Sequence, residues 1–113
     1  MSQLNSHAII DQAFVNVAAS QTDSEVYAAV AGKKIRVHSA VFQCGGTATN
    51  LTFNTKGSGA GVAISMLFAN GANGGAVLPF AENGWFETAA GEALTVTTAA
   101  GSTTGIHVIV SQA

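Results

Sequence analysis

The segment Lys34-Ile35-Arg36-Val37-His38 alternates apolar and polar side chains. Successive side chains of a β-strand point to opposite faces, so we expect Ile35 and Val37 on one face and Arg36 and His38 on the other. The same period of two recurs in Leu51/Phe53, Val62/Ile64/Met66/Phe68, Leu94/Val96 and Ile106/Val108/Val110. Clusters of Gly, Asn, Ser and Thr interrupt these runs at intervals of roughly eight to twelve residues, and no helix is indicated. The sequence therefore predicts an all-β sandwich or barrel.

The pattern predicts eight or nine short strands, within Gln12–Ala19, Glu25–Ala31, Lys34–Gln43, Thr49–Thr55, Val62–Phe68, Gly75–Phe80, Gly84–Thr88, Ala93–Thr98 and Gly105–Gln112. Turns with a positive φ, which glycine adopts at little steric cost, are expected at Gly32, Gly45-Gly46, Asn73-Gly74-Gly75, Asn83-Gly84 and Gly91. Pro79 has no N–H and suits a strand end at a sheet border. The glycine-rich segment 57–61 is expected to be a projecting loop.

Charged residues are unusually scarce in this chain. They make up 9% of its 113 residues and give a net charge of −2, where an ordinary soluble domain has roughly a quarter. Four fixed cations are too few for nucleic-acid binding by counterion release. No apolar run approaches the ~18 residues that span a bilayer. The length predicts one domain, over residues 12–113, with a surface of uncharged side chains that suits an assembly subunit.

The first eleven residues show no clear period and are expected to form an N-terminal arm. The arm contains Leu4, Ile9 and Ile10, whose side chains would be a liability if fully exposed. One interpretation is that it docks on a neighbouring subunit by adding its backbone to a sheet edge, and the other is a frayed terminus. The segment lacks the basic and apolar regions of a secretory signal, so we expect synthesis in a reducing cytoplasm.

No group of residues indicates catalysis or metal binding. The single cysteine, Cys44, is expected to be a small core residue. The three histidines, His7, His38 and His107, lack ligand-pair spacing, although His38 and His107 could share an exposed face on adjacent strands. The acids Glu82, Glu87 and Glu92 are expected to be solvated or to pair with Lys33, Lys34 or Arg36 across an interface. The chain is therefore predicted to be no enzyme and to use no cofactor and no metal.

The most concentrated aromatic site is Trp85-Phe86, which follows the turn at Asn83-Gly84. Adjacent strand residues face opposite sides, so one ring can enter the core while the other covers the sheet end or an interface. Core packing is the favoured interpretation, and use in a binding site is the alternative.

Four segments together resemble the small β-sandwich virion proteins of tailed bacteriophages: Ala31-Gly32-Lys33-Lys34-Ile35-Arg36-Val37, Leu78-Pro79-Phe80, Gly84-Trp85-Phe86-Glu87-Thr88 and Gly91-Glu92-Ala93-Leu94. The resemblance covers roughly residues 27–113. It implies a jelly-roll-like sandwich that acts as a capsid cement or decoration protein on the outside of the head, over junctions of the major capsid protein. It implies no catalytic residues. Related modules in head fibres and tails leave a second reading open, in which loops or Trp85 bind a host glycan or a partner fibre.

Capsid junctions also constrain self-association. A three-fold junction favours a homotrimer, because closed symmetry lets one patch satisfy every copy, and a dimer at two-fold positions is the alternative. Neither a nucleic acid nor a membrane is an expected partner. The residues predicted to contact the capsid or other copies are Leu4, Ile9, Ile10, Lys33, Lys34, Arg36 and Trp85.

Overall fold

The computed structural model describes residues 9–113 and contains only strands and turns there. The ten strands are β1 (Ile9–Val17), β2 (Ser24–Tyr27), β3 (Ile35–Cys44), β4 (Thr49–Lys56), β5 (Val62–Ala63), β6 (Phe68–Asn70), β7 (Gly75–Leu78), β8 (Phe86–Glu87), β9 (Ala93–Thr98) and β10 (Thr104–Gln112). The all-β prediction is confirmed. No helix long and apolar enough to cross a membrane occurs in this part of the chain.

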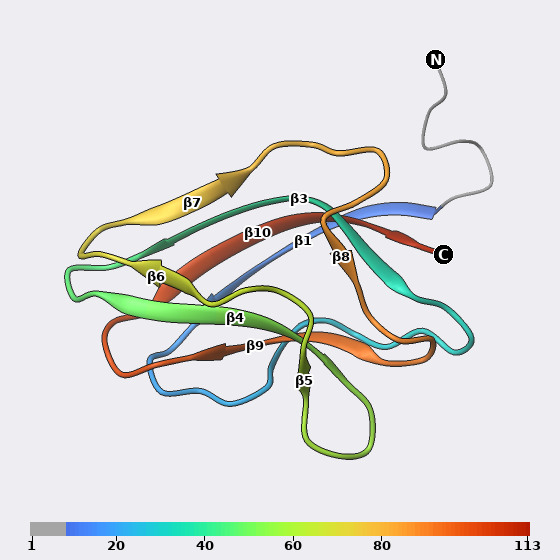
Figure 1. The fold of residues 1–113 in the computed structure, drawn as a ribbon, viewed down its shortest axis with the longest axis horizontal. Helices are drawn as coiled ribbons and strands as arrows, with labels where there is room; N and C mark the ends of the chain where they lie inside the picture. The colour runs from blue at the N-terminus through green and yellow to red at the C-terminus, as the bar shows by residue number, and fades with distance from the viewer. Residues whose placement is uncertain (1–8) are drawn as a thin grey trace.

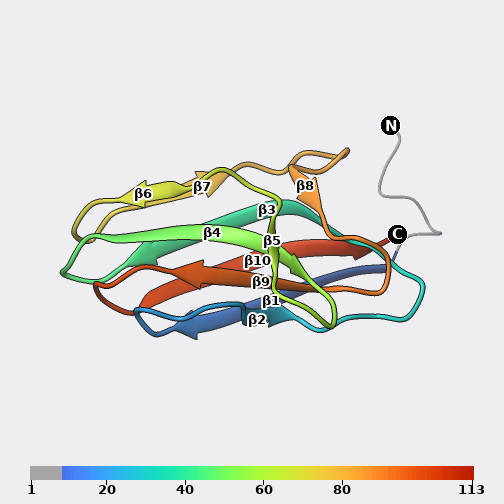
Figure 2. The same ribbon diagram turned by 60° about the horizontal axis from the view of Figure 1, so that its bottom comes forward.

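The strands form two antiparallel five-stranded sheets (Figures 1 and 2). Sheet A has the order β1-β10-β3-β7, with β8 pairing the other end of β3, and sheet B has the order β2-β9-β4-β5, with β6 also pairing β4. Along the chain, successive strands mostly alternate between the two sheets. The exceptions are β4, β5 and β6, which all lie in sheet B, and β7 and β8, which both lie in sheet A. This alternation produces the two-sheet jelly roll, so the predicted sandwich is confirmed.

The core lies between the inner faces of the two sheets. Sheet A supplies fully buried side chains such as Ile35, Val37 and Val108, and sheet B supplies Leu51 and Phe53. An aromatic cluster joins the layers, with ring centroids 5.9 Å apart for Phe42 and Phe53, 4.9 Å for Phe42 and Phe68, and 5.0 Å for Phe53 and Phe86. The period of two in the sequence thus identifies most of the core.

His38 is buried and not exposed as expected, because Phe80 and Ala81 of the segment between β7 and β8 and Ser111 of β10 contact its ring. It also lies at a bulge in β3. The β3–β10 register shifts so that Ser39 faces Ile109 and Val37 faces Val110, which leaves His38 as an extra residue. Its imidazole is fully buried. Nε2 lies 2.7 Å from Ser111 Oγ and Nδ1 lies 2.9 Å from the Ala81 carbonyl oxygen. The suggestion that His38 and His107 share an exposed face is wrong, because only His107 is exposed.

The predicted strand Val62–Phe68 is two short strands in the structure. β5 pairs with Asn54 and Thr55, and β6 pairs with Thr49–Leu51. After β5 the Ile64 N–H still donates to the Phe53 carbonyl oxygen of β4 at 2.9 Å, and the chain then leaves the ladder. The alternation of faces is lost there, and Val62 and Met66 are 65% and 70% exposed. The apolar pattern of this segment therefore overstates its burial.

Turn geometry agrees with the sequence at Gly32, Gly84 and Gly91, whose φ angles are 71°, 85° and 77°. At Gly84 a side chain is also excluded by space, because a Cβ would lie 2.5 Å from Arg36 Cγ. In the expected turn at 73–75 the positive φ belongs to Asn73, at 57°. The predicted turn at Gly45-Gly46 forms without a positive φ.

Candidate functional site

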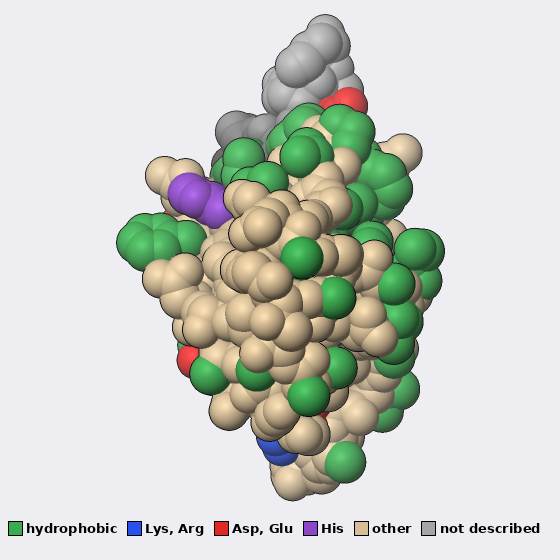
Figure 3. All heavy atoms as spheres, turned by 90° about the vertical axis from the view of Figure 1, so that its left-hand side faces the viewer, with side chains coloured by type: hydrophobic (Ala, Val, Ile, Leu, Met, Phe, Trp, Pro, Cys, Tyr) green, Lys and Arg blue, Asp and Glu red, His purple; other side chains and the backbone are tan. Residues whose placement is uncertain are grey.

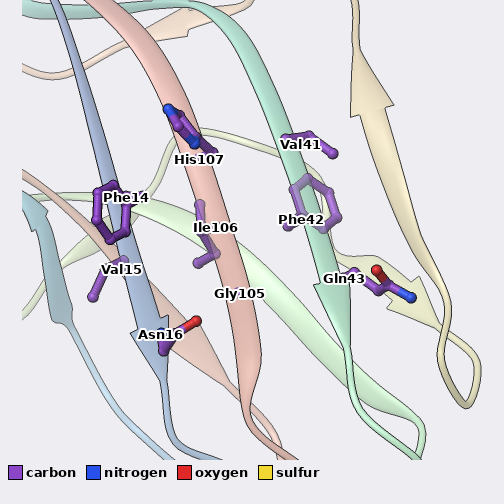
Figure 4. Close-up of a pocket in the computed structure, with 9 residues that line it drawn as sticks. All are labelled: Phe14, Val15, Asn16, Val41, Phe42, Gln43, Gly105, Ile106 and His107. Atoms are coloured by element: carbon purple, nitrogen blue, oxygen red, sulfur yellow. The ribbon is translucent and has the colours of Figure 1, made fainter.

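The outer face of sheet A carries an exposed row of side chains that crosses four strands. Phe14 of β1 faces His107 of β10, His107 faces Val41 of β3, and Val41 faces Val77 of β7. Phe14 is 76% exposed, Val41 46% and Val77 68%. The Phe14 and His107 rings lie 5.7 Å apart (Figure 4). We call these four residues the outer row.

An open hollow lies beside the outer row, over β10. Its floor is at Gly105, and Phe14, Asn16, Gln43 and His107 stand among the residues around it (Figure 4). The hollow exists because glycine places no side chain between β1 and β3. His107 is held at its rim, with Nε2 3.2 Å from Gln12 Oε1. The surface combines apolar contact area with a few polar groups, which is typical of protein interfaces.

The outer row contains no Asp, Glu, Lys or Arg. The nearest charged residues in its sheet are Asp11 on β1 and the Arg36–Glu87 pair, at the end of the sheet where β1 begins and β10 ends. Figure 3 shows the same scarcity at the end of the sandwich where β3 meets β4, where uncharged side chains cover nearly all of the surface. A surface of uncharged side chains forms no ion pairs with a partner, so it suits apolar contact.

The outer face of sheet B is polar instead and binds one loop. Asp23, at φ 52°, accepts hydrogen bonds through Oδ1 from Asn54 (3.1 Å) and Thr95 (3.4 Å) and through Oδ2 from the N–H of Gly61 (3.0 Å). Lys56 Nζ donates to the carbonyl oxygen of Gly59 at 2.7 Å. The predicted projecting loop at 57–61 is therefore held to the body of the protein by Asp23 and Lys56.

Two predicted interface cations are engaged within the chain. Arg36 Nη2 and Nε lie 2.8 and 2.9 Å from Glu87 Oε1, and Lys34 Nζ lies 3.3 Å from Oε2. The pKa of the Glu87 carboxyl is below its usual 4.5, chiefly because Arg36 donates a hydrogen bond to it; Lys34 adds to the effect and burial opposes it. The expected pairing of Glu87 with basic residues thus occurs inside one molecule. Lys33 is exposed, and its contact with a partner stays a prediction.

The predicted arm is described only at its last residues. Ile9 and Ile10 open β1, paired with Gln112 and Ser111 of β10, so β1 begins earlier than the sequence indicated. The Ile10 side chain is 45% exposed. Leu4 lies outside the described residues. Docking of the arm on a neighbour stays a prediction.

The aromatic pair divides between core and surface as expected. Phe86 packs on Phe53, while Trp85 is 46% exposed and donates its indole N–H to the Pro79 carbonyl oxygen at 2.7 Å. Phe80 belongs to the same segment and is 54% exposed. Its ring stacks on His38, with ring centroids 5.6 Å apart. The segment between β7 and β8 therefore carries two exposed aromatic rings.

Cys44, Glu87 and Glu92 do not converge on a site. Cys44 is buried with Sγ 3.0 Å from the Gly71 carbonyl oxygen. Glu87 contacts Arg36, whereas Glu92 accepts a hydrogen bond from Thr55 Oγ1 at 2.8 Å. Over residues 9–113, no three His, Cys, Asp or Glu side chains are grouped as a metal site would need.

Sequence reasoning did not identify the outer row, although a signal for it exists. Phe14-Val15, Val41-Phe42 and Val77-Leu78 are apolar doublets, and His107 lies between two apolar residues. In a strand, an apolar doublet places one apolar side chain on each face. Doublets on three strands of one sheet therefore indicate that both faces of that sheet are apolar.

Comparison with known proteins gives little further guidance. No protein-family model and no curated protein matches the chain. Among solved structures, the chain is similar to a virus-like particle of the extra small virus (XSV) of the giant freshwater prawn Macrobrachium rosenbergii, determined by cryo-EM. The similarity covers 93% of this chain and 79% of that chain, with 11% identity and a TM-score of 0.39. So low a TM-score supports no argument about function.

Proposed function

We propose that this chain is a non-enzymatic structural protein of a phage virion, a cement or decoration protein that binds the outer face of the major capsid shell at subunit junctions. The observation that carries the proposal is the exposed, uncharged outer row on sheet A. The sequence resemblance to phage virion proteins supplies the virion as its setting. The attachment surface is the outer face of sheet A.

Binding of this kind stabilises a shell without chemistry. Covering Phe14, Val41 and Val77 removes apolar area from water, on the order of 1 to 2 kcal/mol for each side chain. Polar groups at the rim, such as His107 and Gln43, can bond the partner directly or through water. A protein that binds only the assembled shell shifts the equilibrium toward assembly by mass action.

The test uses viral heads that lack this protein. Adding the purified chain should raise the temperature at which heads release their genome, and the chain should sediment with them. The double variant Val41→Lys/Val77→Lys should fold but fail to bind, because it places charges in the outer row. The matched control is Thr52→Lys, on the outer face of sheet B, which should bind as the wild type does. Equal head stability with and without the chain contradicts the proposal.

The exposed aromatic rings favour a second candidate function, a tail or head-fibre module that binds a host surface glycan. Trp85 is fixed by its bond to Pro79, and Phe80 is fixed by its stack on His38. Fixed, half-exposed rings can stack on the apolar faces of sugars at little entropic cost. A glycan array probed with wild type and Trp85→Ala decides this case. Binding that Trp85→Ala abolishes supports it, and silence of the wild type excludes it.

A further inference from the structure

Strand β1 is a long edge strand with an open side. It has nine residues and pairs with β10 alone, while the other edge strands, β2, β5, β6, β7 and β8, have two to four residues each. Its described residues include one charge, Asp11, and no lysine or proline. Natural proteins usually protect long edges with such residues, because an open edge is a template for another strand.

The register shows which backbone groups of β1 point to the open side. In an antiparallel ladder, alternate residues direct both N–H and C=O to one neighbour. On β3 the N–H of Cys44 bonds Gly74, on the β7 side, and the N–H of Gly45 bonds Thr103, on the β10 side. The registers of β3 with β10 and of β10 with β1 extend this alternation to β1. The odd-numbered residues of β1 direct their backbone N–H and C=O groups to β10, and the even-numbered residues direct theirs to the open side. The N–H of Gln12 agrees, since it is donated to Asp11 Oδ1 at 2.8 Å.

We propose that a second copy of this chain binds here, by antiparallel pairing of β1 with β1 around a two-fold axis at Ala13. This register pairs Gln12 with Phe14 and Ile10 with Asn16, so all four residues with outward backbone groups find partners. A strand pairing with itself across a two-fold axis makes a closed, isologous dimer.

Charge and shape agree with this register. The single acid, Asp11, faces Val15 of the second copy, so no like charges are opposed. Asp11 releases the Gln12 N–H to the second copy and keeps its bond from the Tyr27 hydroxyl, which is 2.9 Å from Oδ2. The exposed Phe14 rings of the two copies lie diagonally across the axis, within reach of aromatic contact.

The partner is a second β1 rather than another edge of sheet A. A head-to-tail arrangement, which could close into the expected trimer, would pair the nine residues of β1 with the four of β7. That pairing leaves most of the open edge of β1 without partners. The geometry therefore favours the two-fold alternative, and it joins two sheet A outer faces into one surface with Phe14 near its centre.

Sedimentation of the full-length chain over a range of concentrations tests the inference. The wild type should be a dimer, and Phe14→Lys should shift it to monomer, because two lysines would then meet across the axis. The matched control, Val77→Lys, changes a residue of similar exposure at the opposite edge and should stay dimeric. A monomeric wild type, a trimer, or a dimer that survives Phe14→Lys overturns the inference.

A cross-link tests the register and does not depend on the fold of the lysine variant. Residues opposite each other in a non-hydrogen-bonded pair have Cα atoms about 4.5 Å apart, within the range of a disulfide. Ala13→Cys should therefore form a disulfide-linked dimer under mild oxidation, whereas Val77→Cys should not, and native Cys44 is buried. Absence of the Ala13→Cys dimer overturns the register. Neither experiment contains capsid, so a failure here is separate from a failure of shell binding.

Discussion

Glu87 makes stability depend on pH at the scale of one residue. Its pKa is lowered in the folded chain, mainly by the hydrogen bond from Arg36, so its ion pairs stabilise the fold above the usual value of 4.5 and are lost as pH falls through the lowered pKa. We expect the midpoint of urea unfolding to be steady at neutral pH and to fall in acid. Part of that fall should be missing in Glu87→Gln. Because the pair is about one-third exposed, the effect should be modest and should weaken in salt.

Arg36→Gln is the matched variant, because it removes the main cause of the shift while leaving the carboxyl in place. Its unfolding profile should flatten in the same pH range. Identical acid profiles for wild type and Glu87→Gln would contradict the assignment.

Individual residues also show where sequence reasoning fails. The alternation in Lys34–His38 correctly places Ile35 and Val37 in the core, because every strand with one buried face must obey it. It cannot reveal the bulge that makes His38 an extra residue, or the Ala81 and Ser111 partners that satisfy its buried ring. Those contacts join segments far apart in the chain, and no local pattern specifies them.

At the scale of elements, the position of β7 depends on the absence of a side chain at Gly75. A Cβ there would overlap the Phe42 carbonyl oxygen of β3. We expect Gly75→Ala to destabilise the fold by roughly 1–3 kcal/mol, the usual cost of overpacking, and to loosen β7 and Val77 with it. Gly46→Ala is the control, because a Cβ at Gly46 meets nothing within 4 Å. Denaturant unfolding and hydrogen exchange of β7 measure both effects; equal exchange in the two variants would contradict this account.

Strands were predictable from the sequence where burial of one face enforces the alternation of apolar and polar residues. They were not predictable where that burial is incomplete. Strands β3, β4, β9 and β10 lie inside their sheets and match the expected ranges within a residue or two. The segment Val62–Phe68 lies at the margin of sheet B, pairs with β4 in two short stretches and keeps little of its alternation. The outer row was not predictable for the opposite reason, because an apolar side chain in a strand usually faces the core and the side chains of this row do not.

At the scale of the whole molecule, sheet A carries the exposed apolar side chains of the outer row while the outer face of sheet B is polar, and this contrast predicts how the molecule should respond to salt. The outer row contains no Asp, Glu, Lys or Arg, and the net charge of the chain is only −2. Attachment to heads should therefore survive molar NaCl, which screens charges, and should strengthen in ammonium sulfate, which favours apolar burial. Cosedimentation across both salts measures this. A Lys33→Gln/Lys34→Gln variant should bind as the wild type does. If NaCl releases the chain from heads and that variant fails to bind, the two lysines attach the chain to heads and the outer face of sheet A does not.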